Sequence, residues 1–585
     1  MMKFRFGCLI AFLMLAGCNK IDVKTPFEIK GDNYSASYEE GIAFYTQLAK
    51  LSPKASLLEY GVSDSGEPIY LFVLSKKIIE DKNSLQFNKK TVVLINNDIH
   101  PGEPAGVDAT MMLARDILKV DSLTRLLEHV VVGIIPYYNI GGALNRNSTS
   151  RANQVGPEEY GFRGNAKNLD LNRDFIKSDS RNAKVFAQIY QDLAPHVFVD
   201  NHTTNGADYH YPLTLISTQK DKMNPLLADF MTQQMVPHIE RRMKEKGYEV
   251  VPYVNSIGQT PEMGIIGFLE TPRYSSGYAS LFNAISFISE AHMLKPFETR
   301  VWATYNFNKE LLEFCSSRSE EINSNKISAD KATQTQPNFE LTWELDTNEK
   351  VLIDFKGYDA EFRQSEVTGL QRQYYNRDKP FTKKVKYFNK YRPTTVKSKP
   401  EAYIVPQAYS EIVDLLKLNG VKIQKITKSQ NIEVESYYID NYQTLGGPFE
   451  GHYLHYNTSV RWESQSYELK KGDFLVYCNQ VRNNFIVHVL EPEGTDSYFN
   501  WNFFDAILGQ KEYFSSYVFE DTAAELLRAN PKLKIDFESK KSQDVEFASN
   551  ARAQLNFIYK NSEYYEKSHL RYPIRRLLDG SQLSK

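Results

Sequence analysis

Disulfide-forming cysteines and an excess of one charge are both missing from this sequence. Of the four cysteines in 585 residues, Cys8 and Cys18 lie at the very start, and Cys315 and Cys478 are far apart, so they do not make a disulfide framework. The 70 basic and 72 acidic residues leave a net charge of −2. This balance gives no reason to expect nucleic acid as a partner.

Long apolar runs are also missing, because no segment approaches the eighteen residues that a membrane-spanning helix needs. The first residues carry only a short apolar run, 6–16, after Lys3 and Arg5, which is typical of a signal peptide. The run ends in "LAGC" and resembles the lipobox of bacterial lipoproteins. That resemblance implies that residues 1–18 are a lipoprotein signal peptide and that Cys18 is lipidated. An ordinary secretory signal with an incidental cysteine is the alternative.

The remaining chain divides into two regions of different pattern. Residues 25–320 alternate strand-like segments, such as "TVVLIN" and "HVFVDNH", with helix-like ones, such as "VDATMMLARDIL". This alternation predicts an α/β domain with a mainly parallel or mixed central sheet flanked by helices. Residues 320–337 are polar and without periodicity, and we interpret them as a linker. Short strand-like segments dominate 338–585, which predicts a β-rich accessory region.

The pattern His-x-x-acid occurs at His100/Glu103 and at His488/Glu491, and about one or two such matches are expected by chance. The second pair lies in "FIVHVLEP", interpreted as a strand, where residues three apart point to opposite faces. His100 and Glu103 flank Pro101-Gly102, a turn that can bring both side chains to one side. Only the first pair therefore has the geometry of two metal ligands.

A third ligand should come from another strand end, since α/β sheets bind at the carboxyl ends of their strands. His202, in "HVFVDNHTTNG", has that position. Between the two sites lies "NLDLNRDF". In it, Asp170 could accept a hydrogen bond from the non-ligating nitrogen of His100. Asn172 and Arg173 offer an amide and a planar fork for a carboxylate.

The ordered set H-x-x-E, D-x-N-R and a strand-end histidine resembles the zinc metallocarboxypeptidases of the carboxypeptidase A type over about residues 35–320. The resemblance implies one Zn²⁺ per chain, bound by His100, Glu103 and His202, with Asp170 orienting His100. It also implies that Asn172 and Arg173 hold the terminal carboxylate of a peptide. Two histidines, a glutamate and an open fourth position are typical of catalytic zinc.

The same family has an arginine that polarises the scissile carbonyl and a glutamate that acts as general base. Arg151 is the candidate for the first role and Arg163 its rival. For the base we favour Glu290, in "AISFISEAHMLKPF", over Glu270, because a helical pattern follows it as in the family. Tyr274 and Tyr278 are both candidates for a family tyrosine near the substrate and are not separated by the sequence.

We therefore expect a zinc metallocarboxypeptidase that acts on peptides with a free C-terminus and is held by a lipid anchor in the bacterial cell envelope, at the periplasm or outer membrane. One alternative is a zinc amidase or deacylase acting on cell-wall peptides or acylated amino acids. Another is a binding lipoprotein of the cell envelope that has no catalytic activity. The oligomeric state and the preferred terminal residue do not follow from the sequence.

Overall fold

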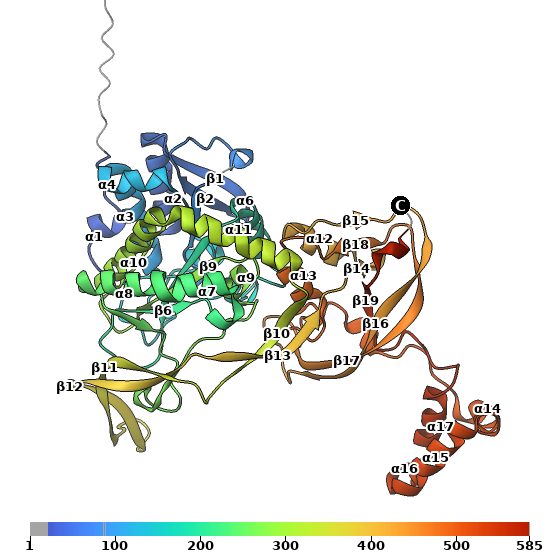
Figure 1. Cartoon of the computed structure of the whole chain (residues 1–585). Helices are drawn as coiled ribbons and strands as arrows, with labels where there is room; N and C mark the ends of the chain where they lie inside the picture. Colours follow the sequence, from blue (N-terminus) through green and yellow to red (C-terminus); the bar gives the residue numbers. More distant parts are fainter. Residues whose placement is uncertain (1–20, 86, 88, 584–585) are drawn as a thin grey trace, which may run out of the picture.

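The computed structural model describes residues 21–583 except 86 and 88, so the predicted lipidation site, Cys18, lies outside the described residues. The described chain forms an α/β body and a β-rich body beside it, and a small helical segment projects from the second (Figure 1). None of the helices in these ranges combines the length and the apolar character needed to cross a bilayer.

An eight-stranded mixed sheet forms the centre of the α/β body, with the strand order β1-β2-β4-β3-β5-β9-β6-β7. The inner neighbours β4, β3, β5 and β9 are parallel, whereas β1, β2 and β6 join antiparallel. β3, β4 and β5 are buried at every residue, as expected for central strands of a sheet that helices cover on both faces. The bounds are β1 Ala55–Val62, β2 Pro68–Leu74, β3 Thr91–Asn96, β4 Val130–Ile135, β5 Val197–Thr204, β6 Leu213–Ser217, β7 Val250–Pro252 and β9 Ile285–His292.

Helices cover both faces of this sheet, which confirms the predicted α/β class. Phe198 of β5 packs on Phe186 of α6, and Phe287 of β9 packs on Phe307 of α10. Phe287 pairs in register with Val199, the next residue after Phe198, so the two phenylalanines point to opposite faces. The main helices are α2 Tyr38–Leu51, α3 Ala105–Lys119, α6 Arg181–Leu193, α7 Pro225–Phe230, α8 Val236–Glu245, α9 Ser275–Ser280 and α10 Phe297–Ser317.

The predicted linker at 320–337 is wrong, because α11 (Ser319–Thr335) occupies it. Ile322, Lys326, Ala329 and Thr333 are buried, and this spacing is one face of a helix. The stripe holds a single large apolar residue, so hydrophobic periodicity did not reveal it. The Lys326 ammonium donates to the Phe282 carbonyl at 2.8 Å, which compensates for its burial.

The β-rich body contains a six-stranded sheet with the order β15-β18-β14-β19-β16-β17. This confirms the prediction of a β-rich region after residue 338. The strands are β14 Ala402–Val405, β15 Gln424–Lys425, β16 Gln430–Thr444, β17 His455–Leu469, β18 Phe474–Tyr477 and β19 Arg571–Leu577, with the helix α12 Ser410–Leu418 beside them.

A long hairpin arm returns from this region to the α/β body. β11 (Val351–Gln364) and β12 (Gln371–Phe388) form the arm, and β12 pairs with β8 (Ile265–Ile266) of the first body. A bridge between Tyr209 and Gly357 adds a second attachment. β10 (Asn338–Leu345) and β13 (Tyr391–Ser398) pair with each other at the base of the arm. The chain therefore crosses between the two bodies more than once.

Residues 483–490, interpreted as a strand, form the buried helix α13 (Asn483–Leu490). The β-branched residues of "FIVHVLE" favour a strand, but burial on several sides allows a helix here. His488 Nε2 donates to the Thr495 carbonyl at 2.5 Å, and Glu491 accepts from Tyr403 at 2.6 Å. The pair thus fails to converge on a metal, for a different reason from the one the sequence suggested.

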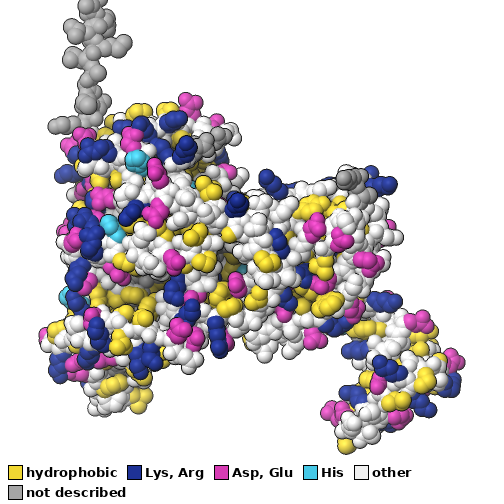
Figure 2. All heavy atoms as spheres, in the orientation of Figure 1, with side chains coloured by type: hydrophobic (Ala, Val, Ile, Leu, Met, Phe, Trp, Pro, Cys, Tyr) yellow, Lys and Arg dark blue, Asp and Glu magenta, His cyan; other side chains and the backbone are white. Residues whose placement is uncertain are grey.

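Four helices between β18 and β19 form a small separate unit. They pack around their own apolar cluster, which includes Phe519, Leu533, Phe537 and Phe547. Figure 2 shows this unit projecting from the rest of the molecule, with basic and acidic side chains interspersed over its visible face. The helices are α14 Ser516–Ala529, α15 Pro531–Gln543, α16 Val545–Ser549 and α17 Ala551–Lys560.

Candidate metal centre

A tight turn after β3 brings the first two candidate ligands together. The Glu103 N–H donates to the His100 carbonyl at 2.8 Å, which closes a turn over Pro101 and Gly102. His100 Nδ1 then lies 3.4 Å from Glu103 Oε1. Gly102 is needed for close approach, since a Cβ there would be 2.6 Å from Cδ of Arg151. Both side chains therefore point to one side of the turn.

His202, near the end of β5, completes a cluster of three buried ligands. Its Nδ1 lies 3.2 Å from Glu103 Oε2. Two ligands of a tetrahedral zinc ion at 2.0–2.2 Å lie about 3.3 Å apart. His100 Nδ1 is buried and makes no hydrogen bond within the described chain. His100, Glu103 and His202 are also the single group of potential ligands found among the described residues, and their spacing and chemistry fit zinc.

An aspartate faces the far nitrogen of each histidine. Asp170 Oδ1 is 2.9 Å from His100 Nε2, as the sequence predicted. Asp200 Oδ2 is 3.1 Å from His202 Nε2, and this residue was missed. The signal was available, because Asp200 and His202 are alternate residues of one strand and must share a face. A carboxylate in this position keeps the nitrogen that faces the metal free to bind.

The segment "DLNR" contains a 3-10 turn, Leu171–Arg173. Asp170 caps it by accepting the Asn172 N–H at 2.9 Å. Asn172 Oδ1 accepts from the Ser275 N–H at 3.2 Å, which leaves its amide nitrogen to donate. The Arg173 guanidinium lies over the ring of Tyr274, 4.5 Å from its centroid. An amide and a guanidinium thus follow directly after Asp170, the aspartate that contacts His100.

Tyr274 and Tyr278 have different surroundings. Tyr274 stacks on Arg173, as described above, whereas Tyr278 is fully buried and donates to Asn419 Oδ1 at 2.6 Å. Tyr278 is a packing residue, and of the two only Tyr274 lies beside the candidate site.

Both candidate arginines reach the cluster. The Arg151 guanidinium bonds to Glu103 and to the Thr203 carbonyl at 3.2 Å. Arg163 lies 3.4 Å from Glu103 and donates to Asp170 at 3.0 Å. Arg151 is the more enclosed, with 18% of its side chain exposed against 45% for Arg163. A cavity of about 280 Å³ is lined by His100 and by both arginines.

Glu290 lies beside the metal ligands on β9. It is the register partner of His202 on β5, so the two side chains lie on the same face of the sheet. Burial raises the pKa of Glu290 to about 7, although His202 opposes this shift. A carboxyl with a pKa near neutrality can both accept and return a proton at physiological pH.

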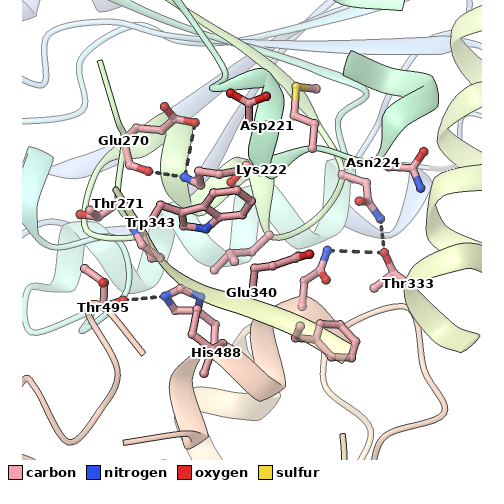
Figure 3. A pocket seen from close by; sticks show the side chains of 18 of the residues that line it. Asp221, Lys222, Asn224, Glu270, Thr271, Thr333, Glu340, Trp343, His488 and Thr495 are labelled. Carbon is pink, nitrogen blue, oxygen red and sulfur yellow. Dashed lines mark hydrogen bonds and ion pairs between the residues drawn. The ribbon is translucent and has the colours of Figure 1, made fainter. Parts of the chain in front are cut away.

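Glu270, the rival for the base, has a different environment. Its Oε1 accepts the Gln219 N–H at 2.9 Å and lies 3.5 Å from Lys222 Nζ. Figure 3 shows Glu270 joined to Lys222 in a pocket that it shares with Trp343 and His488. This cavity of about 510 Å³ lies between the two bodies, and none of the three metal ligands lines it. Glu270 is therefore an ion-paired residue away from the metal centre.

Neighbouring charges shift the pKa values of two metal ligands, Glu103 and His202. Burial would raise the pKa of Glu103, but Arg151 and His100 hold it well below its usual value. Burial would likewise lower the pKa of His202, but Asp200 and Glu103 raise it well above its usual value. Glu103 therefore stays ionised, which is the state that a metal ligand requires.

The N-terminal body also matches known proteins. Residues 42–232 match the family model for zinc carboxypeptidase. The N-terminal body therefore matches the zinc carboxypeptidase family over these residues. Its members use zinc, and His100, Glu103 and His202 lie within the matched range, as do Asp170, Asn172 and Arg173. Glu290 lies outside it, so the prediction that Glu290 is the general base depends on its position in the structure.

The alignments with curated relatives cover most of the chain. It is 20% identical to carboxypeptidase 2 of Trichophyton rubrum over 486 residues, which is 78% of this chain and 81% of that protein. The corresponding protein of Trichophyton equinum is 20% identical over 455 residues, 73% of this chain and 76% of its own. A metallo-carboxypeptidase structure from Burkholderia cenocepacia aligns at 18% identity over 48% of this chain and 70% of its own, with a TM-score of 0.36.

We predict that both aspartates contribute to zinc binding. Asp200→Asn and Asp170→Asn should each weaken zinc affinity by about 10- to 100-fold, because each removes a carboxylate from a metal histidine. Competition with a zinc chelator, followed by zinc content, measures this directly. Asp192→Asn, at the surface end of α6 and away from the site, is the control. An Asp200→Asn protein with unchanged zinc affinity would show that Asp200 has no such role.

Proposed function

We propose that this protein is a zinc-dependent exopeptidase that removes single residues from the C-terminus of peptides. The observation that supports it best is the position of Asn172 and Arg173 directly after Asp170, which contacts His100. An amide and a guanidinium can together bind a carboxylate. In a peptide the C-terminal carboxylate lies one residue beyond the last peptide bond, which is the bond that an exopeptidase of this kind cuts. Without this pair, the centre would be equally suited to an internal peptide bond.

Zinc bound at this centre supplies a Lewis acid that acidifies water and polarises a carbonyl. In our proposal Glu290 removes the proton from the attacking water and then delivers it to the leaving amine. Arg151 donates hydrogen bonds to the carbonyl oxygen as negative charge develops on it, with Arg163 as the alternative donor. Asn172 and Arg173 hold the terminal carboxylate, and Tyr274 covers one face of the guanidinium.

Glu290→Gln should retain zinc and lower kcat by about 10²–10⁴-fold, because the amide cannot accept the proton. Glu270→Gln is the matched control, and it should change stability rather than turnover. Since the base acts in its ionised form, kcat/KM of the wild-type enzyme should rise with pH on the acid side. A bound cation lowers the pKa of Glu290, which puts this limb below pH 7. Normal kcat in Glu290→Gln together with an inactive Glu270→Gln would reverse the assignment.

A peptide library tests the substrate class. Half of the library carries free C-termini and half is amidated, and products are identified by mass spectrometry with zinc-loaded protein. We expect losses of single C-terminal residues from the free half alone. Arg173→Ala should raise KM for these peptides by about 10- to 100-fold through loss of charge-assisted hydrogen bonds. Equal activity on amidated or acylated substrates, without dependence on Arg173, would instead favour an amidase or deacylase.

We also propose that the protein is a lipoprotein of the bacterial cell envelope, held in the membrane through Cys18. The support is the basic start, the short apolar run and "LAGC" in residues 1–18. Cys18→Ser should move the expressed protein from the membrane fraction to the soluble fraction and remove incorporated fatty acid. Membrane association that survives this substitution without fatty acid would contradict the proposal.

A further inference from the structure

A short hairpin of the β-rich body touches the candidate active site. Residues 445–454 connect β16 to β17, and Phe449 and His452 exchange two backbone hydrogen bonds of 2.7 and 3.0 Å. The two residues between them, Glu450 and Gly451, form the tip of this connection, which we name the 445–454 hairpin. It is the point where the second body reaches the "DLNR" turn of the first.

Glu450 has an unusual backbone conformation. Its φ is +50° and that of Gly451 is +82°, as in the two-residue turns that favour Asn-Gly. Glutamate is disfavoured there, because its Cβ crowds the backbone in the left-handed region. Residues held in such conformations cluster at functional sites, where the surrounding structure compensates for their cost. A contact made by the Glu450 side chain is therefore expected to compensate for this backbone conformation.

The carboxylate of Glu450 accepts a hydrogen bond from the backbone N–H of Asp170 at 2.8 Å. Asp170 is the residue that joins the parts of the site. Its carboxylate bonds to His100, to the Asn172 N–H and to Arg163. Glu450 thus fixes the backbone of a residue that contacts both His100 and Asn172.

Two more contacts seat the hairpin against the same region. His452 Nε2 lies 2.7 Å from Asp179 Oδ2. Arg273, the neighbour of Tyr274, donates to Asp496 at 2.7 Å and lies over Phe449 at 5.3 Å. The β-rich body is therefore attached to the "DLNR" turn, which contains Arg173, and to the segment of Tyr274, which stacks on Arg173.

We propose that the β-rich body completes the active site and that Glu450 is the positioning residue through which it does so. Glu450 holds the Asp170 backbone, so that Asp170 stays aligned with His100 and Arg173 stays aligned with the substrate's carboxylate. The inference rests on the proposed function for the role of Arg173, but the effect on His100 is independent of any substrate.

Glu450→Gly is the sharpest test, because it separates stability from function. Glycine adopts the left-handed conformation without crowding, which should offset part of the cost of the lost side chain, so the hairpin should still form and the melting temperature should change little. The hydrogen bond to Asp170 is lost, however. We expect zinc affinity to fall by about three- to tenfold, less than for direct removal of Asp170, and KM for peptides with free carboxylates to rise by a similar factor.

Two further variants make the result specific. Glu450→Gln retains an oxygen that can accept from the Asp170 N–H, so it should restore most of the zinc affinity and KM. Glu463→Ala removes an exposed carboxylate from β17 and should leave both unchanged. Zinc affinity and KM that are normal in Glu450→Gly would overturn the proposal. If wild-type protein binds zinc but cleaves no peptide, the exopeptidase proposal fails, while the zinc measurement still decides the role of Glu450.

Discussion

One fully enclosed carboxylate, that of Glu103, sets the conditions for everything around it. An ionised carboxylate in the interior is costly unless opposite charges and hydrogen bonds compensate for it. Here both histidines, Arg151, Arg163 and the Thr203 N–H converge on its two oxygens. The same arrangement that makes Glu103 tolerable also prepares a place for a divalent cation, because the ligand atoms already stand at suitable separations.

Polar residues follow the apolar residues of β3 and β5 because they bond to one another beneath the site. Asn96 of β3 and Asp200 of β5 are register partners and share a hydrogen bond of 3.1 Å. The next pair, Asn97 and Asn201, is joined at 2.8 Å. These bonds satisfy polar groups that would otherwise be buried alone. They also fix Asp200, and through it His202, so the strand ends act as a rigid base for the ligands.

The sequence was most informative where function depends on neighbours in the chain. The turn at "HPGE", the cluster "DLNR" and the strand-end His202 could each be interpreted locally, and the α/β class followed from the alternation of patterns. Prediction failed where tertiary contacts decide the outcome. α11 buries a lysine in place of an apolar residue, and α13 consists of residues that favour strands. Glu450 contacts a residue 280 positions earlier, and no local pattern in a single sequence can indicate such a contact.

The order of strands in the β-rich sheet has a consequence for biogenesis. β19, formed by residues 571–577, lies between β14 and β16, near the middle of the sheet. Domains fold as units during synthesis, earlier parts first, and a sheet cannot close around a strand that has not yet been made. The α/β body can therefore assemble before the β-rich sheet closes. The contacts that the 445–454 hairpin makes with the α/β body are therefore complete only after residues 571–577 have been made.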